Sequence, residues 1–415
     1  MKIFKLFLQL FANETTLNAN TTNQTSMSDT MKTFYDTALL ENAREALVFN
    51  QFAEKQRIHG NKVEWRKFNT FPKAMTPITE GVTPTGSSFG MTKIEADTTQ
   101  HGDYTTITDR LEYEATDPII MGATEEMGAA GGATMDTLTR DNIICGNCVQ
   151  YCPSIAEDGT ETEVLFRKDL DSTCLFTPAI ANKAATFLKK TKTPKNKGSF
   201  IALIHPSVAH DLRESKEWKE FHKYNDTAPI WDGEIGKMHN IRFVESNECK
   251  IHAPAVISGT ANRLQVTEAV TSGTTVKATA LDDNTIEAVT KSIAVYVKGV
   301  ENTITTITVS DGVATITLSN AVSVAVGDMI CGQGAGKDGS CTYDTLVFGA
   351  KAYGVVEPEN ESMKMIIKDK SVIGGPLELY STIGYKFSHG AKILYQERIL
   401  RIESGSSFSF EDTEN

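Results

Sequence analysis

The feature that most limits the fold is residues 61–115, a long extended stretch with little of its own to pack against. Val63 and Trp65 alternate with charged residues as in a half-exposed strand, and three prolines and several glycines break the middle. Tyr104 to Tyr113 has the pattern of a returning strand. Because an isolated two-stranded ribbon is marginal in water and loops this long are usually functional, the ribbon needs a surface to lie against.

Aromatic side chains are spread along this ribbon, and we take five residues as candidate subunit contacts: Trp65, Phe68, Phe71, Phe89 and Tyr104. Large apolar side chains that a chain cannot cover itself mark interaction surfaces. Two interpretations stay open. The aromatic residues join the core of their own chain, or they contact a neighbouring subunit.

Helical patterns flank the ribbon. Leu40, Ala43 and Leu47 recur at helical spacing and predict an amphipathic helix from Met31 to Arg57. Residues 117–144 are rich in Ala and Met and predict a long helix, although Gly131 and Gly132 each cost about 1 kcal/mol relative to Ala. Gly146 is a suitable residue just after the end of that helix.

A mixed α and β pattern follows. Residues 177–190 predict a helix with a Thr cap, residues 200–206 predict a short buried strand, and Ser207 is expected to cap the helix that comes next. Residues 241–248 predict a further strand. This alternation indicates an α/β or α+β domain.

From residue 260 to 340 the composition becomes rich in Thr, Val and Ala, in short alternating runs. Two such runs meet at Asp311-Gly312 and predict a hairpin. The aromatic-rich pattern resumes at residues 343–358, and residues 381–404 predict two more strands. The segment 260–340 is therefore predicted to be a small all-β domain inserted into the host domain.

The overall composition excludes several classes of protein. A chain of 415 residues is long for one core, so more than one domain is expected. A net charge of -12 disfavours a dedicated nucleic-acid binder. Residues 13–30 are mostly polar and predict a mobile N-terminal arm. The start resembles a secretory signal, but Lys5 and Gln9 interrupt its apolar run, and we favour an amphipathic arm.

Three of the seven cysteines, Cys145, Cys148 and Cys152, have a spacing found in iron-sulfur proteins. A fourth ligand is missing, because Asn142 lies where the preceding cysteine would be. A metal site would have to recruit Cys174 or a distant histidine. We favour a helix end that leads into a strand, and the sequence alone leaves a metal site as an alternative.

The order of these segments resembles the major capsid proteins of tailed bacteriophages, in particular the N4-like branch of the Hong Kong phage capsid fold. The resemblance is carried by "LQLFAN" at 8–13, "NAREALVFNQFAEKQRI" at 42–58, "EWRKF" at 64–68, "PITEGVTPTG" at 77–86, "QHGDYTTITDRLE" at 100–112, "LTRDNIICGN" at 138–147, "IHPSVAHDL" at 204–212, "RFVE" at 242–245, "GYKFSHGAKIL" at 384–394 and "RIES" at 401–404. Together these segments cover most of the chain outside residues 260–340.

The resemblance implies an α+β fold of the Hong Kong phage type. The implied parts are an N-terminal arm (1–30), an N-terminal helix (31–60), the E-loop (61–115), a P-domain with its spine helix (116–176), the first part of the A-domain (177–259), the inserted β domain (260–340) and the completion of the A- and P-domains (341–415). The inserted domain is absent from the common pattern of the family.

The resemblance also implies a structural protein with no enzymatic activity, no cofactor and no catalytic residue. Its partners would be copies of itself in hexamers and pentamers of an icosahedral head around double-stranded DNA, with portal, scaffolding or cement proteins and no membrane. It would be found in the virion, assembled in the host bacterial cytoplasm. The alternative is a cell-surface adhesin or surface-layer protein, which the β-rich segment and the apolar N-terminus suggest.

Overall fold

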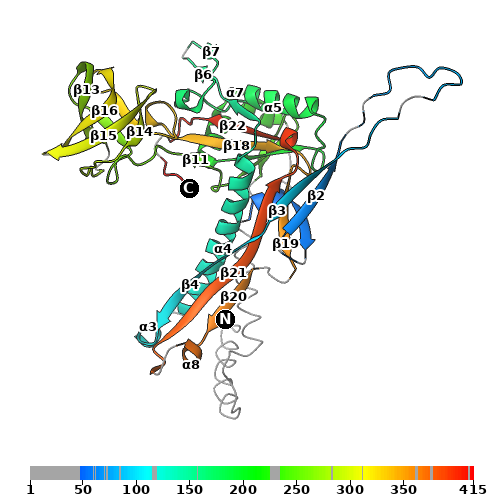
Figure 1. The fold of residues 1–415 in the computed structure, drawn as a ribbon, viewed down its shortest axis with the longest axis horizontal. Helices are drawn as coiled ribbons and strands as arrows, with labels where there is room; N and C mark the ends of the chain where they lie inside the picture. Colours follow the sequence, from blue (N-terminus) through cyan, green and yellow to red (C-terminus); the bar gives the residue numbers. More distant parts are fainter. Residues whose placement is uncertain are drawn as a thin grey trace.

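A computed structural model describes residues 47–415 apart from residues 59, 61, 70, 72, 84–85, 115–118, 157, 225–233, 282–283, 311, 360–362, 374–376 and 410–411. The predicted arm of residues 1–30 and the predicted helix up to residue 46 lie outside the described residues. The described chain has an elongated sheet with one long helix, a second sheet with further helices above it, a barrel on one side and a thin ribbon on the other (Figure 1).

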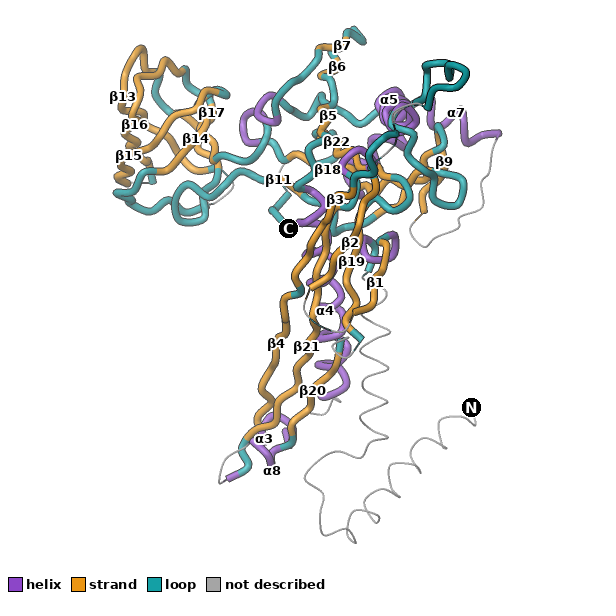
Figure 2. The backbone as a smooth tube through the Cα atoms, turned by 45° about the vertical axis from the view of Figure 1, so that its right-hand side comes forward, coloured by secondary structure: helices purple, strands orange, loops and turns teal. Residues whose placement is uncertain are grey.

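The elongated sheet is organised around one long strand, β21 (Tyr380–Ile393). Its strands run in the order β1-β19-β21-β20, and β4 also pairs with β21. The other strands are β1 (Glu54–Ile58), β4 (Thr99–Thr108), β19 (Tyr353–Pro358) and β20 (Lys364–Lys368), with the short helices α3 (Asp109–Glu114) and α8 (Lys370–Ile373) at the far end (Figure 2).

The long helix predicted over residues 117–144 is present as α4 (Ile119–Ile144), which runs along the elongated sheet. A Cβ atom at Gly131 would lie 2.1 Å from Cε of Met363 and 3.2 Å from Cδ2 of Tyr385. The glycine therefore allows a close approach between helix and sheet. After the helix, the amide of Gly146 donates a hydrogen bond to the carbonyl of Ile143 (3.2 Å), as expected of a residue beside a helix end.

The predicted helix of residues 31–60 is wrong over its described part. Residues 49–52 form a short 3-10 helix, η2 (Phe49–Phe52), and the next residues form β1. β1 pairs in parallel with β19, from Glu54 opposite Gly354 to Ile58 opposite Pro358. Strand pairing with residues some three hundred positions away overrides the local helix propensity, which is a weak determinant of structure.

The ribbon consists of β2 (Lys62–Phe68) and β3 (Met91–Asp97), which pair antiparallel with Phe68 opposite Met91. The prediction that Tyr104 to Tyr113 is the returning strand of this ribbon is wrong. Residues 99–108 form β4, which pairs with β21 in the elongated sheet, and residues 109–114 form α3. β3 ends at Asp97, just before β4 begins, so the chain leaves the ribbon earlier than its local pattern indicates.

The second sheet has the strand order β5-β22-β18-β8-β10-β9, and β11 also pairs with β18. These strands are β5 (Val149–Tyr151), β8 (Phe200–Ile204), β9 (Glu234–Met238), β10 (Ile241–Glu245), β11 (Ile251–His252), β18 (Thr342–Phe348) and β22 (Ile399–Ser404). The helices α5 (Pro178–Lys190), α6 (Pro206–Glu214) and α7 (Lys216–Tyr224) pack against it through a buried apolar cluster.

The predicted helix at 177–190 and the strands at 200–206 and 241–248 are therefore confirmed as α5, β8 and β10. Thr177 is the residue before α5, but its side chain forms no capping hydrogen bond. The predicted Ser207 cap is wrong. Pro206 opens α6, so the capping position falls on His205, whose Nδ1 accepts a hydrogen bond from the Ser207 amide (3.2 Å).

A closed barrel forms from six strands in the order β12-β13-β16-β15-β14-β17. They are β12 (Arg263–Val266), β13 (Val270–Ala280), β14 (Ile293–Val297), β15 (Val300–Ser310), β16 (Val313–Val324) and β17 (Met329–Gly332), around an apolar core of their own. The predicted hairpin is β15 and β16, with Ser310 opposite Val313. The chain enters from β11 and returns to β18, which pair with each other.

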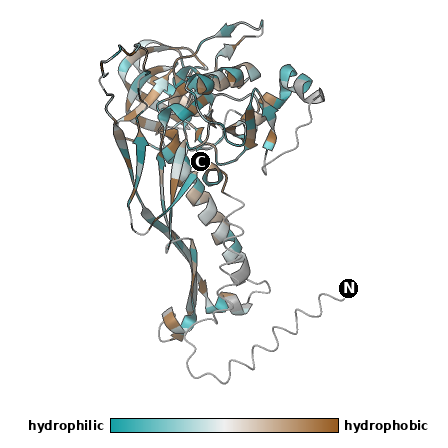
Figure 3. Cartoon of the chain, turned by 90° about the vertical axis from the view of Figure 1, so that its right-hand side faces the viewer, coloured by the Kyte–Doolittle hydropathy of each residue, from teal (hydrophilic) through white to brown (hydrophobic). Residues whose placement is uncertain are grey.

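A small hairpin, β6 (Ser154–Ile155) and β7 (Glu161–Thr162), and the 3-10 helices η3 (Arg167–Asp169), η4 (Lys337–Gly339) and η6 (Gln396–Arg398) complete the described elements. Hydrophobic residues gather in the upper part of the molecule, where the second sheet and the barrel lie (Figure 3). No helix in the described part of the chain is long and apolar enough to cross a membrane.

Candidate subunit-contact surface

The two faces of the ribbon differ in charge. On one face Nζ of Lys93 lies 2.9 Å from Glu64 and 2.5 Å from Glu95, and Nε of Arg66 lies 3.1 Å from Glu64. The hydrogen bond from Lys93 lowers the pKa of Glu64, and the hydrogen bond to Glu95 raises the pKa of Lys93. These pairs are exposed, so they fix strand register more than they add stability.

The opposite face is apolar near the base of the ribbon. Val63 and Ala96 are buried there against Val356 of β19, with Trp65 partly buried beside them. A Cβ atom at Gly354 would lie 2.9 Å from Cζ2 of Trp65, so the glycine leaves room for the indole ring. Trp65 thus contacts the core of its own chain, which is one of the two interpretations of the ribbon aromatics.

Near its tip the ribbon exposes an aromatic cluster. The rings of Phe68 and Phe89 are stacked with centroids 5.1 Å apart, and those of Phe71 and Phe89 are 5.6 Å apart. Their exposed fractions are 57%, 53% and 61% for Phe68, Phe71 and Phe89. The structure therefore brings three of the predicted contacts together, on a surface that the described part of the chain leaves largely uncovered.

Sequence reasoning missed further exposed apolar side chains on the same ribbon: Met75, Ile78, Val82 and Met91. Met75 is 82% exposed and Ile78 is 76% exposed. The sequence does contain a pattern that could have identified these residues: apolar residues recur between the prolines of a segment that is too extended to form a core of its own. We call Phe68, Phe71, Phe89 and these four residues the ribbon-tip surface.

Tyr104 lies apart from the ribbon tip, on β4 opposite Gly384 of β21. It is 70% exposed and borders a hollow of about 530 Å³ over the elongated sheet. Ile366 of β20, 42% exposed, lines the same hollow. Gly384 lies between Tyr104 and Ile366 and also lines this hollow, so the sheet carries a second partly apolar surface.

The segment that leads into β1 is tied to the long helix by a buried carboxylate. Asp136 of α4 accepts hydrogen bonds from the backbone amides of Val48 (3.0 Å), Phe49 (3.1 Å) and Asn50 (3.1 Å). Burial raises the pKa of Asp136 to about 6, although these three hydrogen bonds act in the opposite direction. Asp136 thereby fixes the place where the chain enters the described fold.

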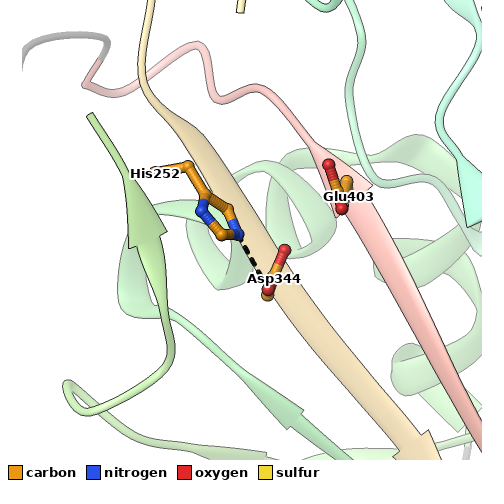
Figure 4. Close-up of side chains that lie close together, drawn as sticks. All are labelled: His252, Asp344 and Glu403. Carbon is orange, nitrogen blue, oxygen red and sulfur yellow. Dashed lines mark hydrogen bonds and ion pairs between the residues drawn. The ribbon is translucent and has the colours of Figure 1, made fainter. Parts of the chain in front are cut away.

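One group in the described part of the chain has the side chains to hold a metal ion: His252, Asp344 and Glu403, on β11, β18 and β22 (Figure 4). Nε2 of His252 lies 3.0 Å from Asp344. Glu403 is fully buried and accepts two hydrogen bonds from Arg167 (2.6 and 2.7 Å), and Arg401 lies 2.9 Å away. Because two guanidinium groups already neutralise Glu403, the group is better suited to join three strands than to bind a cation.

The three clustered cysteines lie in different surroundings. Cys145 is exposed just after α4, Cys148 is partly buried, and Cys152 is fully buried in the core of the second sheet. Burial raises the pKa of the Cys152 thiol far above its usual range and also raises that of Cys148. These surroundings favour thiols over metal-binding thiolates.

Comparison with solved structures identifies the class of fold. A chain in the capsid structure of the cyanophage P-SCSP1u is 12% identical, with 87% of this chain and 89% of that chain covered and a TM-score of 0.51. A chain of the cyanophage Pam1 capsid asymmetric unit is 8% identical, with 94% and 96% covered and a TM-score of 0.53. No family model and no curated protein matches the sequence.

The described chain therefore shares its fold, over most of its length, with chains of phage capsid structures. At these identities the likeness shows the fold alone. Its mixed α+β character agrees with the predicted class.

Proposed function

We propose that this protein is the major capsid protein of a tailed bacteriophage, a structural subunit without enzymatic activity. The observation that carries the proposal is the shared fold, which spans 87% and 94% of this chain in the two comparisons. The ribbon-tip surface also supports the proposal. Its apolar side chains are exposed in the described chain, and a neighbouring subunit that packs on them would bury them.

The proposal assigns a role to each part. The ribbon within residues 61–115 is the E-loop, α4 is the spine helix of a P-domain formed with the elongated sheet, and the second sheet with its helices is the A-domain. Subunits would assemble as hexamers and pentamers of an icosahedral head. The proposal extends to the N4-like branch of this fold, which the sequence segments that carry the resemblance support.

The charge of the chain suits the role of a container. A net charge of -12 gives little general attraction for phosphate, so packaged double-stranded DNA would be enclosed without specific binding. Portal, scaffolding or cement proteins are the other proposed partners, and the virion is the proposed location.

The barrel is proposed to be an insertion in the host fold. Its first and last strands, β12 and β17, pair with each other, and the flanking strands β11 and β18 also pair. A domain inserted between paired strands can be added without disturbing the host sheet. It would decorate the outside of the shell or brace adjacent capsomers.

Electron microscopy of the expressed full chain tests the proposal. We expect closed shells, or rings of five and six subunits, when the chain is concentrated alone or with its proposed phage partners. Only monomers under all of these conditions would contradict a capsid role. Removal of the barrel, with β11 joined directly to β18, distinguishes the two proposed roles of the barrel. If the barrel only decorates the outside, the shortened chain still forms shells. If the barrel braces adjacent capsomers, the shortened chain forms none.

A further inference from the structure

Five lysines lie in the last turn of helix α5 and in the loop that follows it. They are Lys189, Lys190, Lys192, Lys195 and Lys197, all exposed, with no acidic residue between them. Among the described residues, Lys189, Lys190, Lys192 and Lys195 form no ion pair. In a chain with a net charge of -12, four such lysines so close together are an unusual concentration of positive charge. We call these five residues the lysine turn.

The backbone of the lysine turn is well fixed. The carbonyl of Pro194 accepts a hydrogen bond from the amide of Ala350 (2.8 Å), and Asn196 and Ser199 exchange two backbone hydrogen bonds of 2.8 and 3.0 Å. The ammonium group of Lys195 lies 5.9 Å from the centre of the Phe200 ring. The charges are therefore presented from a preorganised turn, which reduces the entropy cost of binding.

An acidic surface lies at the β6–β7 hairpin and the loop after it. Asp158, Glu161, Glu163 and Asp169 are exposed, and none of them forms an ion pair with a described residue. The loop also exposes Leu165 (68%) and Phe166 (59%), which border a hollow of about 430 Å³. Glu163, Asp169, Asp171 and one cation, Lys337, line the same hollow, and the ammonium group of Lys168 lies 5.8 Å from the centre of the Phe166 ring. We call Asp158, Glu161, Glu163, Leu165, Phe166 and Asp169 the acidic hollow.

The two surfaces lie toward opposite ends of the second sheet. The lysine turn leads into β8, whose Ile201 pairs with Phe348 at the end of β18. The hairpin follows β5, whose Tyr151 pairs with Glu403, next to Ser404, which pairs with Tyr343 near the start of β18. A strand of this length spans roughly 20 Å, so the two surfaces cannot neutralise each other within one chain.

We propose that the lysine turn of one copy of this chain binds the acidic hollow of the next copy. Two different, complementary surfaces at opposite ends of one domain form a head-to-tail interface, which closes into a ring when the rotation fits. Lysine ammonium groups pair with the carboxylates, while Leu165 and Phe166 cover the aliphatic parts of the lysine side chains. This inference rests on the proposed capsid function and names the charged contact that would close each capsomer.

Charge reversal in the full chain tests the interface. The turn variant carries Lys190→Glu, Lys192→Glu and Lys195→Glu, and the hollow variant carries Asp158→Lys, Glu161→Lys and Glu163→Lys. Each creates like charges across the contact, and we expect the concentration needed for assembly, measured by light scattering and electron microscopy, to rise about tenfold or more. A chain with all six changes restores opposite charges and is expected to assemble within about threefold of the wild type.

A control with the same charge change carries Lys277→Glu, Lys291→Glu and Lys298→Glu on the barrel. All three lysines are exposed, and Lys277 and Lys298 form ion pairs with Glu268 (3.0 Å) and Asp328 (2.9 Å). This control changes the net charge as much as the turn variant does, and we expect it to assemble within about threefold of the wild type. Thermal unfolding of each unassembled variant checks that the fold is retained. Because exposed charge pairs are screened by salt, the defect of the turn variant should shrink as salt is raised.

The outcomes separate the inference from the function on which it rests. Three results would overturn the inference while the wild-type chain still assembles, and these leave the capsid function standing. The two charge-reversed variants could assemble at the same concentration as the wild type, or the barrel control could show the same defect as the turn variant. The chain with all six changes could also need as high a concentration for assembly as the two three-change variants. A wild-type chain that forms neither rings nor shells would overturn both.

Discussion

Arg140 on helix α4 donates a hydrogen bond from Nη2 to the main-chain oxygen of Asn415 (3.0 Å), across 275 positions of sequence. Its Nη1 donates to the carbonyl of Glu248 (2.9 Å), and its side chain is 1% exposed. Asn415 also receives a hydrogen bond from Ile251 and donates two to neighbouring carbonyls. One buried arginine thus joins the long helix to the second sheet.

We expect Arg140→Met to lower the free energy of unfolding by about 1–3 kcal/mol, because it leaves the carbonyl of Glu248 without this donor, whereas the main-chain oxygen of Asn415 keeps a hydrogen bond from Lys250 (2.8 Å). Denaturant unfolding followed by circular dichroism measures the change. Arg213→Met is the control, since Arg213 pairs with Glu245 at a half-exposed site and its loss should cost less than about 1 kcal/mol. Equal losses in the two variants would show that the buried contacts of Arg140 add little.

Two glycines of α4 give a second prediction. Gly122 has open space where a Cβ atom would lie, so Gly122→Ala should stabilise the chain by up to about 1 kcal/mol through helix propensity. At Gly131 the same atom would displace Met363 and press on Tyr385, so that gain should be cancelled or reversed. Thermal unfolding of both variants checks this. A Gly131→Ala chain as stable as Gly122→Ala would mean that the helix–sheet contact tolerates the methyl group.

The ribbon tip gives a prediction that separates folding from assembly. Phe68, Phe71 and Phe89 are each more than half exposed, so replacing all three with Ser should change the free energy of unfolding of the monomer by less than about 1 kcal/mol. If a neighbouring copy covers them, shell formation should be lost, because buried aromatic anchors dominate interface energetics.

The matched control for the ribbon tip replaces Val300, Val326 and Phe408, which are 65%, 66% and 67% exposed on other parts of the chain, with Ser. This chain should keep its ability to form shells if the contact depends on the ribbon tip. Normal shells from the triple ribbon variant would remove the ribbon tip from the list of contacts.

Local sequence patterns predicted the elements that depend on local chemistry. The long helix, α5, β8 and the β15–β16 hairpin follow from periodicity and turn residues. The same reasoning failed for β1, whose strand form depends on β19, and for the pairing of β4 with β21. These partners are hundreds of positions apart, and the pattern of one strand does not identify its partner.

The candidate site shows the same division. The aromatic residues of the ribbon could be named from the sequence, but whether each is covered depends on the arrangement of distant strands. Trp65 is partly buried because Gly354 leaves space for it, whereas the described part of the chain leaves Phe71 53% exposed. The lysine turn can be recognised from the sequence alone, because its five lysines lie within nine residues. Its position opposite an acidic hairpin appears only once the sheet register is known.

Two buried groups that contact α4 should respond to acid in opposite ways. Asp136 has a pKa raised to about 6 by burial, so the native state binds its proton more tightly than the unfolded chain does. His389 donates to or accepts from Thr139 (2.9 Å), and burial first, then His101, lowers its pKa to about 4. As pH falls from about 6.5 to 4, protonation of Asp136 favours the native state and protonation of His389 favours the unfolded state.

Each shift is worth roughly 3 kcal/mol at about 1.4 kcal/mol per pH unit, so the two contributions nearly cancel in the wild type. Asp136→Asn removes the protonation that favours the native state in acid. Between pH 6.5 and pH 4 we expect the free energy of unfolding of this variant to fall by about 2–3 kcal/mol more than that of the wild type. His389→Gln should show the reverse, because its free energy of unfolding should rise relative to that of the wild type over the same pH range. Urea unfolding at several pH values measures both differences, and parallel pH profiles for all three chains would show that neither group titrates differently on folding.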